Sequence, residues 1–303
     1  MRFDVTILGS SSATPIYNRN PSSQLLNIND RYFLIDCGEG TQVQLIRNGI
    51  KAQRIEHIFI SHLHGDHYLG LVGLLSSLHL NGRTRAMYVY GPPELMEILD
   101  IQFKYSQTQL RYPLIFKATQ VNHPEKIFES NDIIIETFAL DHRIPCTGFK
   151  FSQKKRTRKI RKEIFDELKI PIDFIPELKK GASYTNKAGR VFSADELTIE
   201  PPQPKSYAYC SDTICSWTYL EEIKGVDTLY HEATFMHDMH SRAEETFHTT
   251  TLQAGEIAVR AGVKQLLIGH FSARYRELEP LLEECKAVFE NTRLAIEGQT
   301  FDI

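Results

Sequence analysis

The stretch Ser61-His62-Leu63-His64-Gly65-Asp66-His67 decides the fold of this chain, because it places four metal-binding side chains directly after an apolar run. His62 and His64 are two residues apart, so they point to the same side of an extended backbone. Gly65 permits a sharp turn after them. Asp66 and His67 are adjacent and point in different directions, which suits two neighbouring metal ions better than one. One or two histidines would fit a surface turn, but this density of zinc-type ligands favours a metal site.

The composition is that of an ordinary globular protein of 303 residues, long enough for one large domain or two. With 35 Lys and Arg against 38 Asp and Glu, the formal net charge is -3, so contacts with a polyanion must come from local patches. The five cysteines are odd in number and form no CxxC pair, which predicts reduced thiols in a cytosol. Cys210 and Cys215 could form a redox pair, although two small buried apolar residues explain them better.

The chain shows neither a membrane span nor a signal peptide. No apolar run approaches the length that a bilayer requires. The first residues carry charge and begin a short strand pattern instead of an apolar leader. We therefore expect a cytoplasmic protein that makes no membrane contact.

Further ligand-type residues follow apolar strands elsewhere in the chain. His142, Asp212 and His270 each stand directly after a predicted strand. Residues at strand ends meet on one rim of a sheet, where a rigid scaffold can hold a site. The sequence thus supplies seven candidate ligands for two zinc ions that share one bridging carboxylate and a bridging solvent molecule: His62, His64, Asp66, His67, His142, Asp212 and His270.

Local patterns predict several of the other elements. Asn29-Asp30 separates two apolar runs at 25–28 and 32–35, which is typical of a β-hairpin. Thr250 and Gln253 have the spacing of a capping box, so we expect a helix to begin there. An apolar run at 294–297 predicts the strand that closes the chain.

Two segments differ from this strand-and-helix pattern. The stretch 9–23 is a long polar loop, and long loops in compact domains are often functional. Residues 154–162 hold seven basic residues in nine, and proline-rich sequence follows them. A charge run is usually a solvated helix face. We interpret 151–205 as an excursion from the core rather than as a second independent domain.

The histidine stretch resembles the signature of the metallo-β-lactamase superfamily. Other motifs extend the resemblance over nearly the whole chain and indicate the ribonuclease Z family, zinc endonucleases that remove the 3′ trailer from precursor tRNA. The motifs of residues 231–234 and 248–250 are far more specific to this family than the histidine stretch. The motifs are Asp141-His142-Arg143-Ile144-Pro145-Cys146-Thr147-Gly148, Ser211-Asp212-Thr213, His231-Glu232-Ala233-Thr234, His248-Thr249-Thr250 and Gly269-His270-Phe271-Ser272.

The resemblance implies an α/β fold, a four-layer αββα sandwich formed by a single domain over residues 1–303. The segment 151–205 corresponds to an inserted flexible arm. The resemblance also implies two Zn²⁺ per subunit and a homodimer in which the arm of one subunit serves the active site of the other. One zinc would be held by His62, His64, His142 and Asp212, and the other by Asp66, His67, Asp212 and His270.

The resemblance also assigns roles in catalysis and substrate binding. Asp66 is the expected proton acceptor that helps to generate the attacking hydroxide. His248, oriented by Glu232, is the expected proton donor to the leaving 3′ oxygen, a role that suits an imidazolium near pH 7. The loop with Arg19 and Asn20 is expected to sense the nucleotides after the discriminator. The arm is expected to bind phosphates of the tRNA through Lys154, Lys155, Arg156, Arg158 and Lys159.

Three alternatives share part of this pattern. A hydroxyacylglutathione or lactone hydrolase of the same fold would need neither the basic excursion nor the His248 motif. A flavodiiron-type redox protein typically has a carboxylate in place of His64. A catalytically silent RNA-binding protein would not need the complete ligand set together with Glu232 and His248.

Overall fold

A computed structural model describes residues 2–120 and 123–303. Contacts divide the chain into two compact units, each of which is described by itself. Unit 1 contains the chain up to Phe128 together with Ile135–Phe151 and Lys205–Ile303, and unit 2 contains Glu129–Ile134 and Ser152–Pro204. Unit 2 takes in nearly all of the segment 151–205. That this segment is an arm inserted into a single domain stays a prediction.

The first sheet of unit 1 has seven strands in the order β18-β1-β2-β3-β4-β5-β6. The pairs β18–β1, β1–β2 and β2–β3 are antiparallel, whereas β3–β4, β4–β5 and β5–β6 are parallel. The strands are β1 (Phe3–Gly9), β2 (Ser23–Ile28), β3 (Arg31–Ile35), β4 (Ile55–Phe59), β5 (Met87–Gly91), β6 (Leu114–Ala118) and β18 (Thr300–Asp302).

The second sheet also has seven strands, in the order β17-β16-β15-β14-β9-β8-β7. The neighbours β14–β15, β15–β16 and β16–β17 are parallel, so their carboxyl ends lie at one edge of the sheet. The strands are β7 (Glu125–Glu129), β8 (Ile133–Leu140), β9 (Cys146–Gln153), β14 (Ser206–Cys210), β15 (Thr228–Glu232), β16 (Gln265–Gly269) and β17 (Thr292–Leu294).

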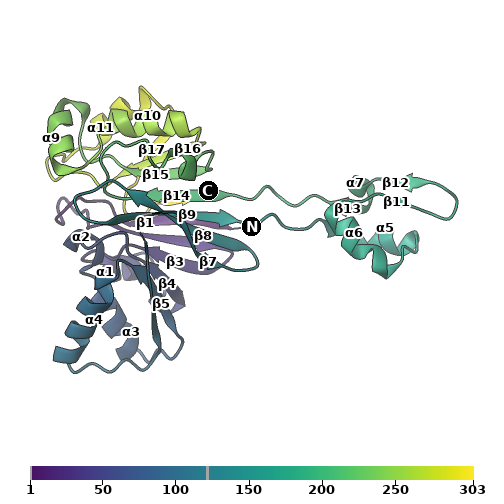
Figure 1. Ribbon diagram of the computed structural model, residues 1–303, viewed down its shortest axis with the longest axis horizontal. Coiled ribbons are helices and arrows are strands. Elements are labelled where there is room, and N and C mark those ends of the chain that lie inside the picture. The colour runs from purple at the N-terminus through teal and green to yellow at the C-terminus, as the bar shows by residue number, and fades with distance from the viewer. Residues whose placement is uncertain (1, 121–122) are drawn as a thin grey trace. The chain divides into compact units, whose positions relative to one another are not determined.

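Helices cover the outer face of each sheet (Figure 1). Beside the first sheet lie α1 (Thr41–Arg47), η1 (Ala52–Arg54), α2 (Gly65–Tyr68), α3 (Leu71–Leu80) and α4 (Glu94–Tyr105). With the second sheet lie α8 (Leu220–Ile223), η3 (His237–Met239), α9 (His240–Thr246), α10 (Thr251–Ala261) and α11 (Glu279–Lys286). Leucines of α3 and α4 pack on the first sheet, and alanines of α10 pack on the second, each in a fully buried cluster. The predicted four-layer αββα fold is confirmed.

Aromatic rings fill the space between the two sheets. Phe59 of β4 lies edge-on to Phe149 of β9, with 5.4 Å between ring centroids, and Phe33 of β3 meets Phe151 at 5.9 Å. All four rings are fully buried. Because edge-to-face pairs add to the free energy of burial, this layer holds the two sheets in one register.

Local sequence signals gave the correct hairpin and helix start, but the last strand was placed wrongly. Asn29 and Asp30 both have positive φ, as the two-residue turn between β2 and β3 requires. Thr250 and Gln253 form the predicted capping box of α10. The strand predicted at 294–297 is wrong, because β17 ends at Leu294 and the chain returns as β18 on the other sheet. A short apolar run does not specify which sheet edge it will join.

Unit 2 is a small structure with its own core. Its elements are β10 (Lys159–Ile160), α5 (Lys162–Glu167), η2 (Ile172–Phe174), α6 (Ile175–Lys180), β11 (Tyr184–Thr185), β12 (Val191–Phe192), α7 (Ala194–Leu197) and β13 (Thr198–Ile199). Five buried side chains form the core: Phe165, Ile170, Leu178, Phe192 and Leu197. The basic run 154–162 is not the helix face that such runs usually form, since it passes through an irregular segment and β10 before α5 begins.

Candidate metal centre

The seven predicted ligand residues come together in unit 1, where the strands of both sheets end. His62 and His64 follow β4, and Asp66 and His67 lie on the short helix α2. The other three follow β8, β14 and β16 of the second sheet and are His142, Asp212 and His270. His270 has a φ of 61°, a left-handed conformation that non-glycine residues adopt mainly where surrounding structure enforces it.

Four donor atoms form a first set. His64 Nδ1 lies 3.1 Å from His62 Nε2 and 3.1 Å from His142 Nε2. Asp212 Oδ2 lies 3.6 Å from His62 Nε2 and 3.8 Å from His142 Nε2. Donors about 2.0–2.1 Å from a tetrahedral zinc ion are separated by about 3.3 Å, so the spacing of this set fits one such ion.

A second set of donors lies on the other side of Asp212. Asp212 Oδ1 is 3.3 Å from His67 Nε2 and 3.2 Å from His270 Nε2. Asp66 Oδ2 is 3.5 Å from His67 Nε2 and 3.4 Å from His270 Nε2. Each oxygen of Asp212 therefore faces a different set, which is the arrangement of a bridging carboxylate.

Two buried polar atoms of this centre have no hydrogen bond among the described residues. They are His67 Nε2 and Asp212 Oδ1, both in the second set. A buried polar atom without a partner is costly, and binding a cation removes that cost. Although burial acts to raise the pKa of Asp212, the neighbouring charges of His270 and His67 hold that pKa well below its usual value. The residues therefore fit a pair of divalent cations.

At three of the candidate histidine ligands, the ring nitrogen that faces away from the site is held by a hydrogen bond. His142 Nδ1 lies 2.9 Å from the Phe247 carbonyl, and His270 Nδ1 lies 2.8 Å from the Thr234 hydroxyl. His67 Nδ1 lies 2.7 Å from Asp36 Oδ2. These partners fix the tautomer and orientation of each ring, so that the second nitrogen faces the site.

Asp36 is a site residue that the sequence reasoning did not assign. It is fully buried after β3 and also accepts hydrogen bonds from the Ser61 amide, the Ser61 hydroxyl and the Tyr209 hydroxyl. Its φ of 54° again shows a backbone that its surroundings hold. Asp36 follows an apolar strand, as His142 and Asp212 do, so the same strand-end signal could have found it.

Glu232 and His248 form a close pair beside the centre. Glu232 is fully buried, and its Oε1 lies 3.0 Å from His248 Nδ1. The same carboxylate accepts hydrogen bonds from the amides of Thr213, Thr234 and Thr249. Burial acts to lower the pKa of His248, but the charge and hydrogen bond of Glu232 outweigh it and raise that pKa to about 9. Glu232 thus favours the protonated imidazolium form of His248.

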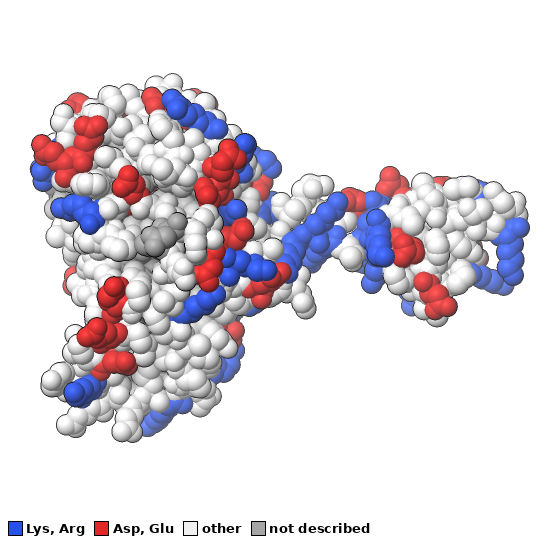
Figure 2. Space-filling view, in the orientation of Figure 1, with Lys and Arg blue, Asp and Glu red and all other residues white. Residues whose placement is uncertain are grey.

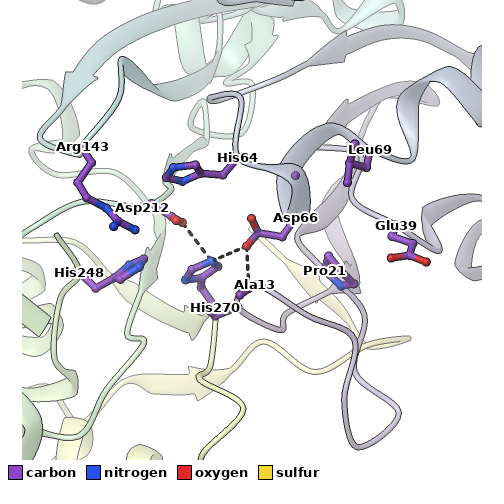
Figure 3. Close-up of a pocket in the computed structure, with 12 residues that line it drawn as sticks. Ala13, Pro21, Glu39, His64, Asp66, Leu69, Arg143, Asp212, His248 and His270 are labelled. Carbon is purple, nitrogen blue, oxygen red and sulfur yellow. Dashed lines mark hydrogen bonds and ion pairs between the residues drawn. The ribbon is translucent and has the colours of Figure 1, made fainter. Parts of the chain in front are cut away.

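A pocket of about 310 Å³ opens onto the centre and is lined by His64, Asp66, Asp212, His248 and His270, among others. Figure 3 shows His248 and Arg143 on one side of it and Pro21, Leu69 and Glu39 on the other. The amide of Ala13 donates a hydrogen bond of 2.8 Å to Asp66 Oδ2. The polar loop predicted at 9–23 therefore reaches the centre.

Arg19 and Asn20 lie in this loop, but the Arg19 side chain is buried. Its guanidinium donates a 2.7 Å hydrogen bond to the Tyr275 carbonyl and longer ones to the carbonyls of Ser272 and Arg276. The amide of Asn20 donates to the Glu297 carboxylate at 3.0 Å. These contacts fix the shape of the loop. A role of either residue in substrate binding stays a prediction.

The five basic residues predicted to bind phosphate in unit 2 differ in their surroundings. Arg158 pairs with Asp195 and Glu200, Lys154 pairs with Glu129 at 2.5 Å, and Lys155 lies 3.7 Å from Glu200. Arg156 and Lys159 are exposed, and no ion pair is found for either among the residues that the structure describes. The face of unit 2 seen in Figure 2 carries both basic and acidic side chains.

The fold and the site define a protein of the metallo-β-lactamase fold. The crystal structure of the metallo-β-lactamase fold protein YhfI from Bacillus subtilis matches over 100% of both chains, with a TM-score of 0.70 and 19% identity. The crystal structure of human tRNase Z, short form, matches over 98% of both chains, with a TM-score of 0.73 and 25% identity.

Curated relatives and a family model give the family. The ribonuclease Z of Phocaeicola vulgatus is 46% identical over 98% of this chain and 96% of its own length, and that of Cytophaga hutchinsonii is 45% identical over 99% and 96%. The chain therefore belongs to the ribonuclease Z family. Its residues 3–158 also match the model of the family described as Anti-Pycsar protein Apyc1, so the chain belongs to that family as well. As a ribonuclease Z, the protein is an endoribonuclease. Among the described residues, no helix is long and apolar enough to cross a membrane.

Proposed function

We propose that the protein is a zinc-dependent endoribonuclease that removes the 3′ trailer of precursor tRNA. Hydrolysis after the discriminator would leave a 3′-hydroxyl on the tRNA and a 5′-phosphate on the trailer. The observation that carries the proposal is the ion pair of Glu232 and His248 beside the seven-residue centre. A lactone or thioester hydrolase of the same fold has no need of such a proton donor.

Two zinc ions would be held by the two donor sets described above, with Asp212 shared between them. Such a pair lowers the pKa of bound water and neutralises charge on the phosphoryl oxygens. Thiolate ligands, which select softer metals, are missing from both sets, and imidazole with carboxylate suits zinc.

Asp66 would accept the proton of the attacking water. Although burial acts to raise the pKa of this carboxyl, the charge of His67 and hydrogen bonds from His270 and His67 hold it well below its usual value. Asp66 is therefore ionised at neutral pH. The Ala13 amide orients the same carboxylate, so that little reorganisation is needed when a proton is transferred.

His248 would protonate the leaving 3′ oxygen of the ribose. Its Nδ1 binds Glu232, which leaves Nε2 as the proton-donating atom toward the pocket. Expelling an alkoxide without an acid is slow, and a positioned general acid contributes about 10²- to 10⁴-fold to the rate. His248 also lies near Asp212 and His270 in a group that could bind a metal, so its role requires a test that separates the two.

The remaining parts of the proposal concern the substrate, the assembly and the compartment. The resemblance supports phosphate binding by the basic residues of unit 2 and sensing of the trailer by the loop of Arg19 and Asn20. A cytoplasmic homodimer is supported by the same resemblance. Exposed apolar side chains of α1, α3 and α4 are available for such an interface: Val43, Ile46, Leu80, Ile101 and Tyr105.

Incubation of the purified protein with zinc and a 3′-extended precursor tRNA tests the activity. We expect one cut after the discriminator, and a trailer that carries a 5′-phosphate. Asp66→Ala should abolish cleavage. His248→Ala should keep the zinc content of the wild type and slow the single-turnover rate by about 10²-fold or more.

Two results would contradict this proposal. Turnover of a lactone or thioester without cleavage of precursor tRNA would indicate a small-molecule hydrolase. Loss of zinc from His248→Ala would show that His248 is a metal ligand and not the proton donor.

A further inference from the structure

Arg143 stands at the mouth of the pocket, directly after the candidate ligand His142 and on the same side as His248 (Figure 3). We propose that Arg143 binds the RNA phosphate that precedes the discriminator nucleotide, one phosphate upstream of the bond that is cut. This inference rests on the proposed function, because it needs an RNA strand whose 3′ oxygen leaves at His248.

The charge distribution around the pocket singles out Arg143. Of the lysines and arginines in residues 2–120 and 123–303, it alone lines the pocket, whereas three carboxylates do so. Its side chain is exposed, and no ion pair joins it to an acid within those ranges. A free guanidinium beside a site for a polyanion is a ready partner for a phosphate.

The loop that carries Arg143 is held by hydrogen bonds at the two residues that precede it. The Asp141 amide donates to the Thr213 hydroxyl at 3.1 Å, and the Ile214 amide donates to the Asp141 carbonyl at 2.8 Å. His142 is fixed through its hydrogen bond to the Phe247 carbonyl. Pro145, two residues after Arg143, removes further backbone freedom. The backbone that carries the Arg143 guanidinium is therefore rigid, which reduces the entropy lost on binding.

The position of Arg143 indicates which phosphate it binds. His248 would protonate the leaving 3′ oxygen, so the ribose of the discriminator nucleotide lies on the side of His248. Arg143 lies on that side, whereas Glu39, Leu69 and Pro21 lie on the other (Figure 3). The charge of the scissile phosphate would be neutralised by the metal centre. The next phosphate on the side of Arg143 is the one that precedes the discriminator nucleotide.

Steady-state cleavage of precursor tRNA by Arg143→Gln tests this contact. Removing one charge-assisted hydrogen-bonding group should lower kcat/KM about tenfold or more. The slope of log kcat/KM against log [KCl] should fall by about 0.7, as expected for one phosphate contact to a single strand. Arg143→Lys should recover part of the activity, because a point charge remains without the planar fork. Arg111→Gln is the matched control, since Arg111 is exposed and does not line the pocket.

A substrate with a neutral methylphosphonate identifies the phosphate. Placed before the discriminator nucleotide, it should slow the wild type as much as Arg143→Gln does, and should slow Arg143→Gln no further. Placed one phosphate into the trailer, it should slow both proteins by the same factor. The assignment is wrong if the trailer modification slows Arg143→Gln no further, while the modification before the discriminator nucleotide does slow it further. Arg143 would then bind the trailer phosphate.

Hydrolysis of bis(p-nitrophenyl) phosphate separates this proposal from the proposed function. That diester has no neighbouring phosphate. The factor by which Arg143→Gln lowers kcat/KM should therefore be at least ten times smaller on it than on precursor tRNA. Equal losses on both substrates would overturn the inference and place Arg143 in the centre itself. Equal kcat/KM of the wild type and Arg143→Gln on precursor tRNA would also overturn it. If the wild type does not cleave precursor tRNA at all, it is the proposed function that fails.

Discussion

At the scale of single residues, the Glu232 carboxylate decides the state of His248. Burial alone would make that imidazole neutral, and the adjacent anion reverses the outcome. Burial acts to raise the pKa of Glu232, but the charge and hydrogen bond of His248 lower it, and three backbone amides and the Thr234 hydroxyl also donate to the carboxylate.

We predict that Glu232→Gln moves the alkaline limb of the pH–rate profile to lower pH. Glu232 raises the pKa of His248, so the wild type keeps its proton donor to higher pH and loses activity as the pH rises through that pKa. Without the anion, burial dominates and the donor is lost at lower pH. Single-turnover rates against pH measure the shift, with the exposed Glu221→Gln as control. An unchanged alkaline limb would show that another group sets it.

The Thr234 hydroxyl connects the acid pair to the metal centre. It donates to Glu232 Oε2 at 2.7 Å and lies 2.8 Å from His270 Nδ1, which donates to it. The motif around His231–Thr234 was recognised in the sequence, but this link was not, since it joins Thr234 to a residue 36 positions away.

We predict that Thr234→Val weakens binding of the second zinc ion about 10- to 100-fold, because His270 loses the partner that orients it. Thr234→Ser keeps the hydroxyl and should bind zinc as the wild type does. Titration against a chromophoric chelator measures both affinities without a substrate. Two tight sites in Thr234→Val would show that His270 is oriented by its backbone alone.

At the scale of secondary-structure elements, the Tyr230 side chain of β15 packs against Gly269, which ends β16 directly before His270. A Cβ added to Gly269 would lie 2.4 Å from the Tyr230 hydroxyl and 2.6 Å from its ring, so the Tyr230 side chain would have to move. Gly73 in α3 has open space around it. The same substitution therefore has different consequences in the two elements.

We predict that Gly269→Ala lowers the free energy of unfolding by about 1–3 kcal/mol through overpacking against Tyr230. Gly73→Ala should leave it unchanged or raise it by up to about 1 kcal/mol, because alanine favours a helix. Urea denaturation of both variants gives the comparison. Equal stability of the two would mean that Tyr230 moves aside freely.

Within unit 2, the basic run divides into structural and free cations. Arg158 is engaged with Asp195, Glu200 and the Thr198 hydroxyl, and its side chain is mostly buried. Arg156 and Lys159 are exposed. Charge density along the sequence did not distinguish them, because the acids that neutralise Arg158 lie about forty residues later.

We predict that Arg156→Ala with Lys159→Ala weakens binding of precursor tRNA and lowers the salt slope of log Kd by about 0.7–0.9 for each cation. Arg158→Ala should instead make unit 2 sensitive to limited proteolysis, since it leaves two carboxylates unpaired. Fluorescence anisotropy and a trypsin time course measure the two effects. The assignment fails if Arg158→Ala weakens binding with no change in proteolysis.

At the scale of the whole molecule, the metal centre draws on both sheets of unit 1. His62, His64, Asp66 and His67 follow the first sheet, whereas His142, Asp212 and His270 follow the second. Ions bound by both groups would cross-link the two halves of the sandwich and would balance the charge of its buried acids.

We predict that a chelator lowers the Tm of the protein and that added zinc restores it. Binding at a concentration of 1,000 Kd stabilises the folded state by about 4 kcal/mol for each site. Hydrogen exchange should become faster around the centre, but not in the core of unit 2, which holds none of the seven residues. The chelator preloaded with zinc is the control. An unchanged Tm would show that bound metal does not cross-link the two sheets of unit 1.

The sequence by itself determined the fold class, the hairpin at Asn29-Asp30, the capping box at Thr250 and the seven candidate ligands. These features depend on neighbouring residues, on the ends of apolar strands or on motifs that retain their spacing. Tertiary structure alone decided the support of His67 by Asp36, the contact of Thr234 with His270 and the neutralisation of Arg158. Each of these joins residues that are 31 or more positions apart, so only the packing of the two sheets, or of unit 2, brings them into contact.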